Sequence, residues 1–198
     1  MPKKASAKPV RSPRTLSPAQ ITHAVKRLAA PTGIDRYAAG KSLITTAEKC
    51  PLCVYPHFSA LAVLLGSESK IIRWNALRIL AALARVDTGN KIAGILDDYL
   101  GFISGGNMIS AAHAIVGAGH IACARPEFLP RILPAILQVE SATYETPECR
   151  NIAIAHALDA LKALWPAVGG KAAVRAFVER QKANSRPTAA RRAWALLP

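Results

Sequence analysis

Long apolar windows rich in alanine and leucine make up most of the chain, and short clusters of glycine, proline and small polar residues separate them. Alanine and leucine lose little conformational freedom in a helix, so these windows favour helices. Few segments alternate β-branched and polar residues in the manner of a strand. The pattern therefore predicts an all-α fold.

The breaker clusters place the predicted helices. Ser17 and Pro18 predict a helix start, because serine caps free backbone amides and proline suits the first turn. This helix runs to about residue 29, and a second helix runs to about residue 49, where Cys50 and Pro51 end it. A helix–turn–helix unit then repeats, with leading helices over about 58–65, 91–103, 128–139 and 171–182 and second helices over about 70–86, 108–124, 148–164 and 188–197.

The repeated units start about 37 to 41 residues apart. A single helical hairpin cannot bury both of its apolar faces, so each unit needs a neighbour on either side. Small residues such as Ala111, Ala114 and Ala118 stand where neighbouring helices must approach closely. We therefore expect the units to stack side by side.

Two motifs in these units resemble HEAT repeats. Residues 128–137 have the sequence FLPRILPAIL, which is similar to the proline-bearing first helix of a HEAT repeat. Residues 72–80 have the sequence IRWNALRIL, which resembles the second-helix pattern Val-Arg-x-x-Ala-x-x-x-Leu, and residues 149–153 repeat its Arg-x-x-Ala core. The unit between them departs from the pattern, with Ser110 and His113 in the arginine and alanine places.

The stretch over about residues 54–198 is thus similar to HEAT/armadillo-like helical-repeat proteins. The resemblance implies an α-α superhelix, a HEAT-like repeat solenoid, whose second helices line a concave binding surface. We expect a disordered basic tail over residues 1–16, which offer little apolar surface to bury, and one helical-repeat domain over residues 17–198.

The formal net charge of +14 lies mostly at the two ends of the chain. Residues 1–30 carry seven basic residues and no acidic one, residues 171–198 carry seven basic residues and one acidic one, and the middle is nearly neutral. Such a field favours acidic or phosphate-rich partners without base specificity. No apolar signal segment accompanies the basic start, so a cytoplasmic protein is expected, with an organelle transit peptide as the alternative.

Residues 99–124 contain no charged side chain, but Gly105, Gly106 and Asn107 divide them. Neither piece approaches the ~20 apolar residues that a bilayer core requires. A helix buried in the stack is therefore expected here, without a membrane span.

The four cysteines, at positions 50, 53, 123 and 149, are too sparse for a disulfide framework in a chain long enough to bury a core. Cys50 and Cys53, followed by His57, have the spacing of half a zinc site, but a fourth ligand is missing. A redox Cys-x-x-Cys lacks its usual strand-then-helix context. We expect two packed thiols at a helix junction, with a metal or redox site as the alternative.

Three histidines, His113, His120 and His156, fall on second helices of adjacent units. His156 and Asp159 are three residues apart and within hydrogen-bonding reach on one helix. A metal or acid–base site could be drawn from these side chains, but buried histidines with satisfied nitrogens are commoner on alanine-rich helices. We expect no metal, no cofactor and no catalytic residue.

The strongest candidate binding face carries Trp74, Arg78 and Arg85, whose spacings of four and seven place them on one side of a helix. Shifted by the repeat, this face continues to Asn151 and Lys162. Tryptophan and arginine are typical anchors of protein interfaces, and they also suit base stacking and phosphate contact. An ordinary solvated face, with the tryptophan packed between units, is the alternative.

A second basic cluster combines Arg186, Arg191 and Arg192 with Trp194 near the C-terminus. Its two interpretations are nucleic-acid contact and a solvated end of the stack, and the second is favoured.

The sequence favours a non-catalytic scaffold that binds a protein or peptide, and not an enzyme. The first alternative is a nucleic-acid-binding protein that clamps phosphates with its basic ends. The more remote alternative is an activity like that of HEAT-like DNA glycosylases, which use tryptophans and an essential carboxylate. This chain has Asp97, Asp98 and Asp159 inside its repeats, but they do not match the arrangement of that family. The oligomeric state is left open.

Overall fold

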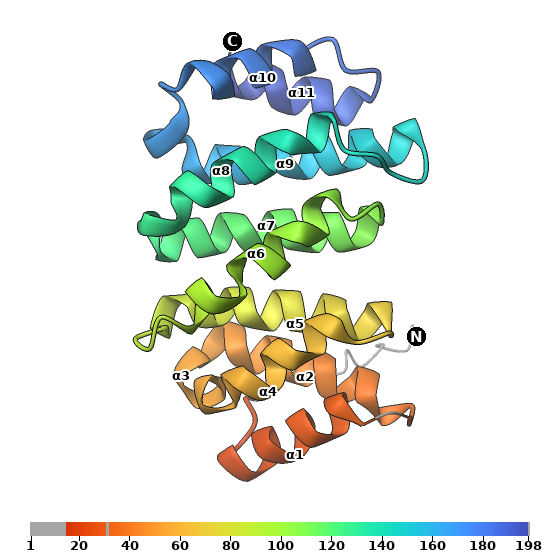
Figure 1. Cartoon of the computed structure of the whole chain (residues 1–198), viewed down its shortest axis with the longest axis vertical. Coiled ribbons are helices and arrows are strands. Elements are labelled where there is room, and N and C mark those ends of the chain that lie inside the picture. Colours follow the sequence, from red (N-terminus) through yellow and green to blue (C-terminus); the bar gives the residue numbers. More distant parts are fainter. Residues whose placement is uncertain (1–14, 31, 198) are drawn as a thin grey trace, which may run out of the picture.

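The computed structural model describes residues 15–30 and 32–197, and every regular element in these ranges is a helix (Figure 1). The expected all-α class is therefore confirmed, and the described ranges contain no strand. Most of the predicted N-terminal tail lies outside the described residues. The α-helices are α1 (Pro18–Ala29), α2 (Asp35–Lys49), α3 (Pro51–Val54), α4 (Phe58–Ala62), α5 (Lys70–Leu83), α6 (Lys91–Ser104), α7 (Met108–Ala124), α8 (Leu129–Leu137), α9 (Pro147–Val168), α10 (Ala172–Gln181) and α11 (Pro187–Leu196).

Helices that follow one another in the chain are arranged along the longest axis of the molecule, from α1 at one end to α10 and α11 at the other (Figure 1). The helices α2, α5, α7, α9 and α11 pack each against the next, and we call them the second-helix layer. The helices α1, α4, α6 and α10 each pack against the member of this layer that follows them in the chain. Packing between consecutive helix pairs thus runs through the described chain.

Local capping residues begin several of these helices where the sequence predicts them. The Ser17 side chain accepts from the Gln20 amide, and the Gln20 side chain accepts from the Ser17 amide, so both free donors at the start of α1 are satisfied. Asn107 and Thr146 cap α7 and α9 through their side-chain oxygens. The helix predicted over residues 108–124 is found with those bounds.

Two stretches that contain proline differ from the prediction. The helix α2 ends at Lys49 as expected, but helical structure resumes at Pro51, and residues 51–66 form short α and 3-10 helices. Pro56, which has no amide to continue a helix, lies in the 3-10 turn between α3 and α4. In contrast, α9 runs past its expected end at residue 164 and contains Pro166. The burial of Val168, which is 0% exposed, stabilises this last turn against the loss of one backbone hydrogen bond.

The core lies between the two sets of helices and consists largely of small and branched side chains. On α7, Ala111, Ala114 and Ala118 are all 0% exposed, as expected from their positions in the pattern. A Cβ atom at Gly119 would lie 3.2 Å from the Cβ of Ala160, so α7 and α9 approach each other closely at this point. Small residues thus allow the tight spacing of the second-helix layer.

Polar contacts between units join residues about one repeat apart in sequence. The pairs Arg131–Asp97, Arg180–Glu140 and Arg186–Glu148 link residues 34, 40 and 38 positions apart. This separation is close to the period of about 37 to 41 residues in the sequence. These contacts are compatible with a helical repeat.

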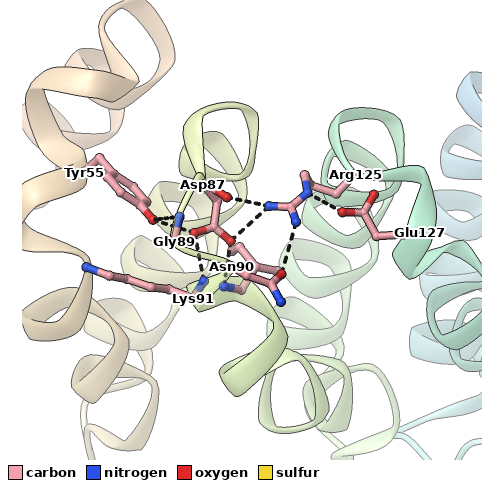
Figure 2. A network of polar contacts seen from close by, with 8 residues as sticks. Tyr55, Asp87, Gly89, Asn90, Lys91, Arg125 and Glu127 are labelled. Atoms are coloured by element: carbon pink, nitrogen blue, oxygen red, sulfur yellow. Dashed lines mark hydrogen bonds and ion pairs between the residues drawn. The ribbon is translucent and has the colours of Figure 1, made fainter.

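The most connected of these contacts is a network around the buried Asp87 (Figure 2). The Asp87 carboxylate accepts from the amides of Lys91 and Ile92, both at 2.9 Å, at the start of α6. It also accepts from the Tyr55 hydroxyl at 2.6 Å and from Arg125 at 3.3 Å. One carboxylate thus joins three successive parts of the stack, at residues 55, 87–92 and 125.

Among the described residues, no helix combines the length and the apolarity needed to cross a bilayer. The uncharged stretch over residues 99–124 is divided between α6 and α7 by a turn at Gly105 and Gly106, as expected.

Candidate binding groove on the second-helix layer

A groove of about 760 Å³ lies along α5 and α7 on the second-helix layer. Glu48 from α2 and His156 from α9 complete its ends, so four members of the layer contribute to it. The lining residues are Glu48, Arg78, Ala81, Ala82, Arg85, Ala112, His113, Val116, Gly117, His120, Cys123, Ala124 and His156. Its volume falls within the range of pockets that hold small molecules or a few peptide side chains.

Small residues make the floor of this groove. Position 117 requires glycine, because a Cβ atom there would lie 1.8 Å from the Tyr99 hydroxyl oxygen and 3.1 Å from the Ala81 Cβ. That hydroxyl is buried and donates to the Leu77 carbonyl at 2.9 Å, so it is not free to move aside. Because the fixed Tyr99 hydroxyl occupies the space beside position 117, α7 carries no side chain at this point.

Two arginines stand at the rim, and both are held by Glu48. Arg78 donates to the Glu48 carboxylate at 3.1 Å, and Arg85 donates to the Glu48 backbone carbonyl at 2.7 Å. The Arg78–Glu48 ion pair is about half exposed on both sides, so water screens it and it contributes little to stability. Only Arg78 is paired with the Glu48 carboxylate, while Arg85 is bound to a neutral backbone carbonyl, so the two arginines leave an excess of positive charge beside the groove.

Two half-buried histidines line the wall of the groove. Burial lowers the pKa of His113 below its ordinary value, and the nearby charges of Arg78 and His156 lower it further. Burial also lowers the pKa of His156, with Arg192 acting in the same direction. Because both pKa values lie below 6.5, the two rings are neutral at pH 7 and can donate or accept one hydrogen bond at each nitrogen.

In the part of the chain that the structure describes, no three His, Cys, Asp or Glu side chains are grouped in a way that could hold a metal ion. The Asp159 carboxylate, which the sequence places within reach of His156, forms an ion pair with Arg192 at 3.0 Å, and its charge acts to raise the pKa of His156 against the lowering by burial. Asp97 is likewise occupied by Arg131.

Of the face predicted from the sequence, the groove includes Arg78 and Arg85 but not Trp74. The Trp74 indole donates to the Ser110 hydroxyl at 2.9 Å, and its ring lies 5.9 Å from that of His113. Trp74 is half-buried and joins α5 to α7, which is the alternative that the sequence also allowed.

The remaining predicted residues lie outside the groove. Asn151 donates to Ser185 at 2.9 Å and accepts from Asn184 at 3.1 Å, so it joins α9 to the turn before α11. Lys162 is exposed farther along α9.

The basic cluster at the C-terminus is largely neutralised by the chain itself. Arg186 forms an ion pair with Glu148, and Arg192 forms one with Asp159. Arg191 is exposed and has no ion-pair partner among residues 15–30 and 32–197. The indole ring of Trp194 is also exposed, and the Lys182 ammonium lies 4.3 Å from its centre.

The sequence did not predict a binding face on α7, although His113 and His120 were already candidate site residues. Positions 113, 116, 117, 120 and 124 recur at spacings of one, three and four, which is one face of a helix. This face could have been found from His113 and His120, which share it. The long apolar composition of α7 concealed it, because the helix is buried on its other sides.

The expectation of two packed thiols was wrong, because Cys50 and Cys53 form a disulfide. Their Cα atoms are 5.4 Å apart, inside the range that a disulfide spans. The helical turn that begins at Pro51 brings them together, and the Cys53 amide donates to the Cys50 carbonyl at 3.0 Å. Cys123 and Cys149 are free thiols.

No protein-family model matches the sequence, and no curated protein matches it significantly. Solved structures do match, among them the crystal structure of an engineered protein from the Northeast Structural Genomics Consortium. That structure is similar to this chain with a TM-score of 0.57 and 17% sequence identity, over 89% of this chain and 77% of the other. A likeness at this identity concerns the fold alone.

Proposed function

We propose that this chain is a non-catalytic binding scaffold, a HEAT-like repeat solenoid whose second-helix layer receives a segment of a protein partner. The segment that fits the groove carries a carboxylate side chain beside small apolar residues. The single observation that carries the proposal is the groove itself, with its floor of small side chains and its rim of two arginines.

The repeat part of the proposal is supported by the contacts between units. Helix pairs follow one another along the molecule, and polar contacts recur at separations of 34 to 40 residues. Stacked hairpins of this kind present a continuous row of second helices, which is a surface suited to an extended or helical ligand.

The chemistry of the partner follows from the lining. Ala81, Ala82 and Val116 offer apolar contact, and Val116 is 38% exposed, so covering it removes apolar surface from water. Arg78 and Arg85 offer guanidinium donors that match a carboxylate in geometry and charge. An incoming carboxylate would compete with the Glu48 carboxylate for Arg78 and with the Glu48 backbone carbonyl for Arg85, and its charge favours it over a neutral or basic segment.

A protein segment fits this groove better than a nucleic acid does. Nucleic-acid affinity comes from several cations that each contact a phosphate. Here the floor is apolar and Glu48 already contacts both arginines, so few cations remain for a phosphate backbone. The basic ends of the chain add long-range attraction toward acidic partners of either kind.

The proposal is tested with short labelled peptides that alternate glutamate and alanine, measured by fluorescence anisotropy at physiological salt. The expected result is saturable binding that falls about tenfold or more when Arg78 and Arg85 are both changed to alanine. Arg131→Ala is the matched control, because Arg131 is also an exposed arginine paired with an acid of the preceding unit, away from the groove.

Two comparisons decide the outcome. A peptide with lysine in place of glutamate should bind much more weakly, and Val116→Asp should weaken the glutamate peptide by placing a like charge in the groove. Equal binding of both peptides, or no effect of the two arginine changes, would refute the groove as an acidic-segment site. Tighter binding of single-stranded or duplex oligonucleotides, with a steep salt dependence, would replace it with a nucleic-acid function.

A further inference from the structure

The disulfide between Cys50 and Cys53 lies at the corner where α2 meets α3, two residues beyond the groove residue Glu48, and neither cysteine lines the groove. Cys53 is exposed and Cys50 is half-buried. The two residues therefore differ in exposure, and we expect an external reagent to reach Cys53 first.

The corner is held by contacts other than the disulfide. Ala47 and Val54, on either side of the two cysteines, are 0% exposed in the core. The Cys50 amide donates to the Thr46 carbonyl at 2.7 Å, which closes the last turn of α2. These contacts do not involve the sulfur atoms, so we expect the helix junction to keep its packing and its backbone hydrogen bonds after reduction.

A bond that closes so short a segment also restricts the unfolded chain less than one that closes a long loop. With two intervening residues, Pro51 and Leu52, this disulfide encloses little chain. Its contribution to folding is small, while its exposure makes it open to exchange. Those two properties distinguish an exchange site from a structural disulfide.

We propose that Cys50 and Cys53 form a thiol–disulfide exchange site that reacts with an external thiol, such as a cysteine-containing peptide or a small thiol. A thiolate of the external molecule attacks the Cys53 sulfur, the bond between the two cysteines breaks, and Cys50 leaves as a thiolate that takes up a proton. Cys53 is then joined to the external sulfur. A second external thiolate attacks that external sulfur, which frees Cys53 and releases the external disulfide.

The net reaction converts one protein disulfide and two thiols into one protein dithiol and one external disulfide. It runs in reverse when the external couple is oxidised, so no other oxidant or reductant is needed. This inference is independent of the groove and its partner, because neither cysteine lines the groove.

The test uses the full chain carrying Cys123→Ser and Cys149→Ser, so that only the pair under study reacts. The protein is equilibrated with mixtures of reduced and oxidised glutathione, and its thiols are counted by alkylation and mass spectrometry. We expect complete and reversible conversion between disulfide and dithiol, with the helical circular dichroism unchanged. A disulfide that persists in fully reduced glutathione, or a loss of helix on reduction, would overturn the proposal.

Single-cysteine variants in the same background identify the sulfur that is attacked. With Cys50→Ser, Cys53 stands alone and should form a mixed disulfide with oxidised glutathione. With Cys53→Ser, the half-buried Cys50 should form it about tenfold more slowly, because access limits the reaction. Equal rates, or a faster reaction of Cys50, would contradict the assigned order. Retained circular dichroism in both variants ensures that the rates compare folded proteins.

Discussion

Replacement of Asp87 by alanine tests the network that joins three successive parts of the stack (Figure 2). The Asp87 side chain is fully buried, and its two oxygens accept from the Lys91 and Ile92 amides. Alanine leaves both amides at the start of α6 without this partner. The Tyr55 hydroxyl and the Arg125 guanidinium also lose an acceptor.

The cost can be worked from these contacts. A hydrogen bond to a charged group contributes about 1.5–3 kcal/mol net, and the two amides form two such bonds. Arg125 adds less, because its side chain is 21% exposed and keeps bonds to the Asp87 backbone carbonyl, Asn90 and Glu127. We therefore expect Asp87→Ala to lower the free energy of unfolding by about 3–6 kcal/mol.

Urea unfolding followed by circular dichroism at neutral pH measures this change. Asp87→Asn, which keeps one acceptor oxygen but no charge, should fall between the wild type and the alanine variant. Asp98→Ala is the matched control, because Asp98 is an exposed aspartate on α6, the helix that Asp87 caps, and it should differ from the wild type by less than about 0.5 kcal/mol. A loss below about 1 kcal/mol for Asp87→Ala would refute the reasoning, since the network would then contribute no more than a surface contact.

The same network predicts a dependence on pH. Burial by itself raises the pKa of Asp87, but the hydrogen bonds from Tyr55, Ile92 and Lys91 and the charge of Arg125 outweigh burial and hold this pKa below its ordinary value of 3.8. A carboxyl whose pKa is lower in the folded state stabilises the fold above the unfolded pKa, and this stabilisation is lost as pH falls through the folded pKa. The difference between wild type and Asp87→Ala should therefore persist at neutral pH and shrink below about pH 3.8.

Two further predictions concern the groove. Gly117→Ala should lower the free energy of unfolding by about 1–3 kcal/mol in a thermal or urea assay, because the added methyl group clashes with the buried Tyr99 hydroxyl. Gly94→Ala on α6 is the control: nothing lies within 4 Å of its new Cβ, so it should be neutral or stabilising in the same assay. The pKa values of His113 and His156 are lowered in the folded state, so the stability that their neutral rings contribute above the unfolded pKa of 6.5 should decline as pH falls below that value. A variant with both histidines changed to glutamine should show a smaller decline in its urea midpoint between about pH 7.5 and about pH 5.5. An equal decline in the variant would assign the effect to other groups.

The sequence by itself determined the helical class and most helix positions. Capping and breaking act over a few residues, so Ser17 starts α1 and Asn107 starts α7 wherever the rest of the chain lies. The approach of helices through small residues was predictable for the same reason, because Ala111, Ala114 and Ala118 repeat at helical spacing. The end of α9 was predicted too early, because the buried turn that follows Pro166 keeps the helix intact through Val168.

Only the tertiary structure decided what the polar side chains do. Trp74, Arg78 and Arg85 share a face in the sequence, yet the first binds Ser110 on the next helix of the layer and the other two bind Glu48 on the previous one. The partners lie 30 to 37 residues away, and no local pattern specifies them. The disulfide likewise depended on the helical turn that starts at Pro51. Local propensity sets where helices lie along the chain, whereas the relative placement of neighbouring helices sets which charges are paired and which surface remains open.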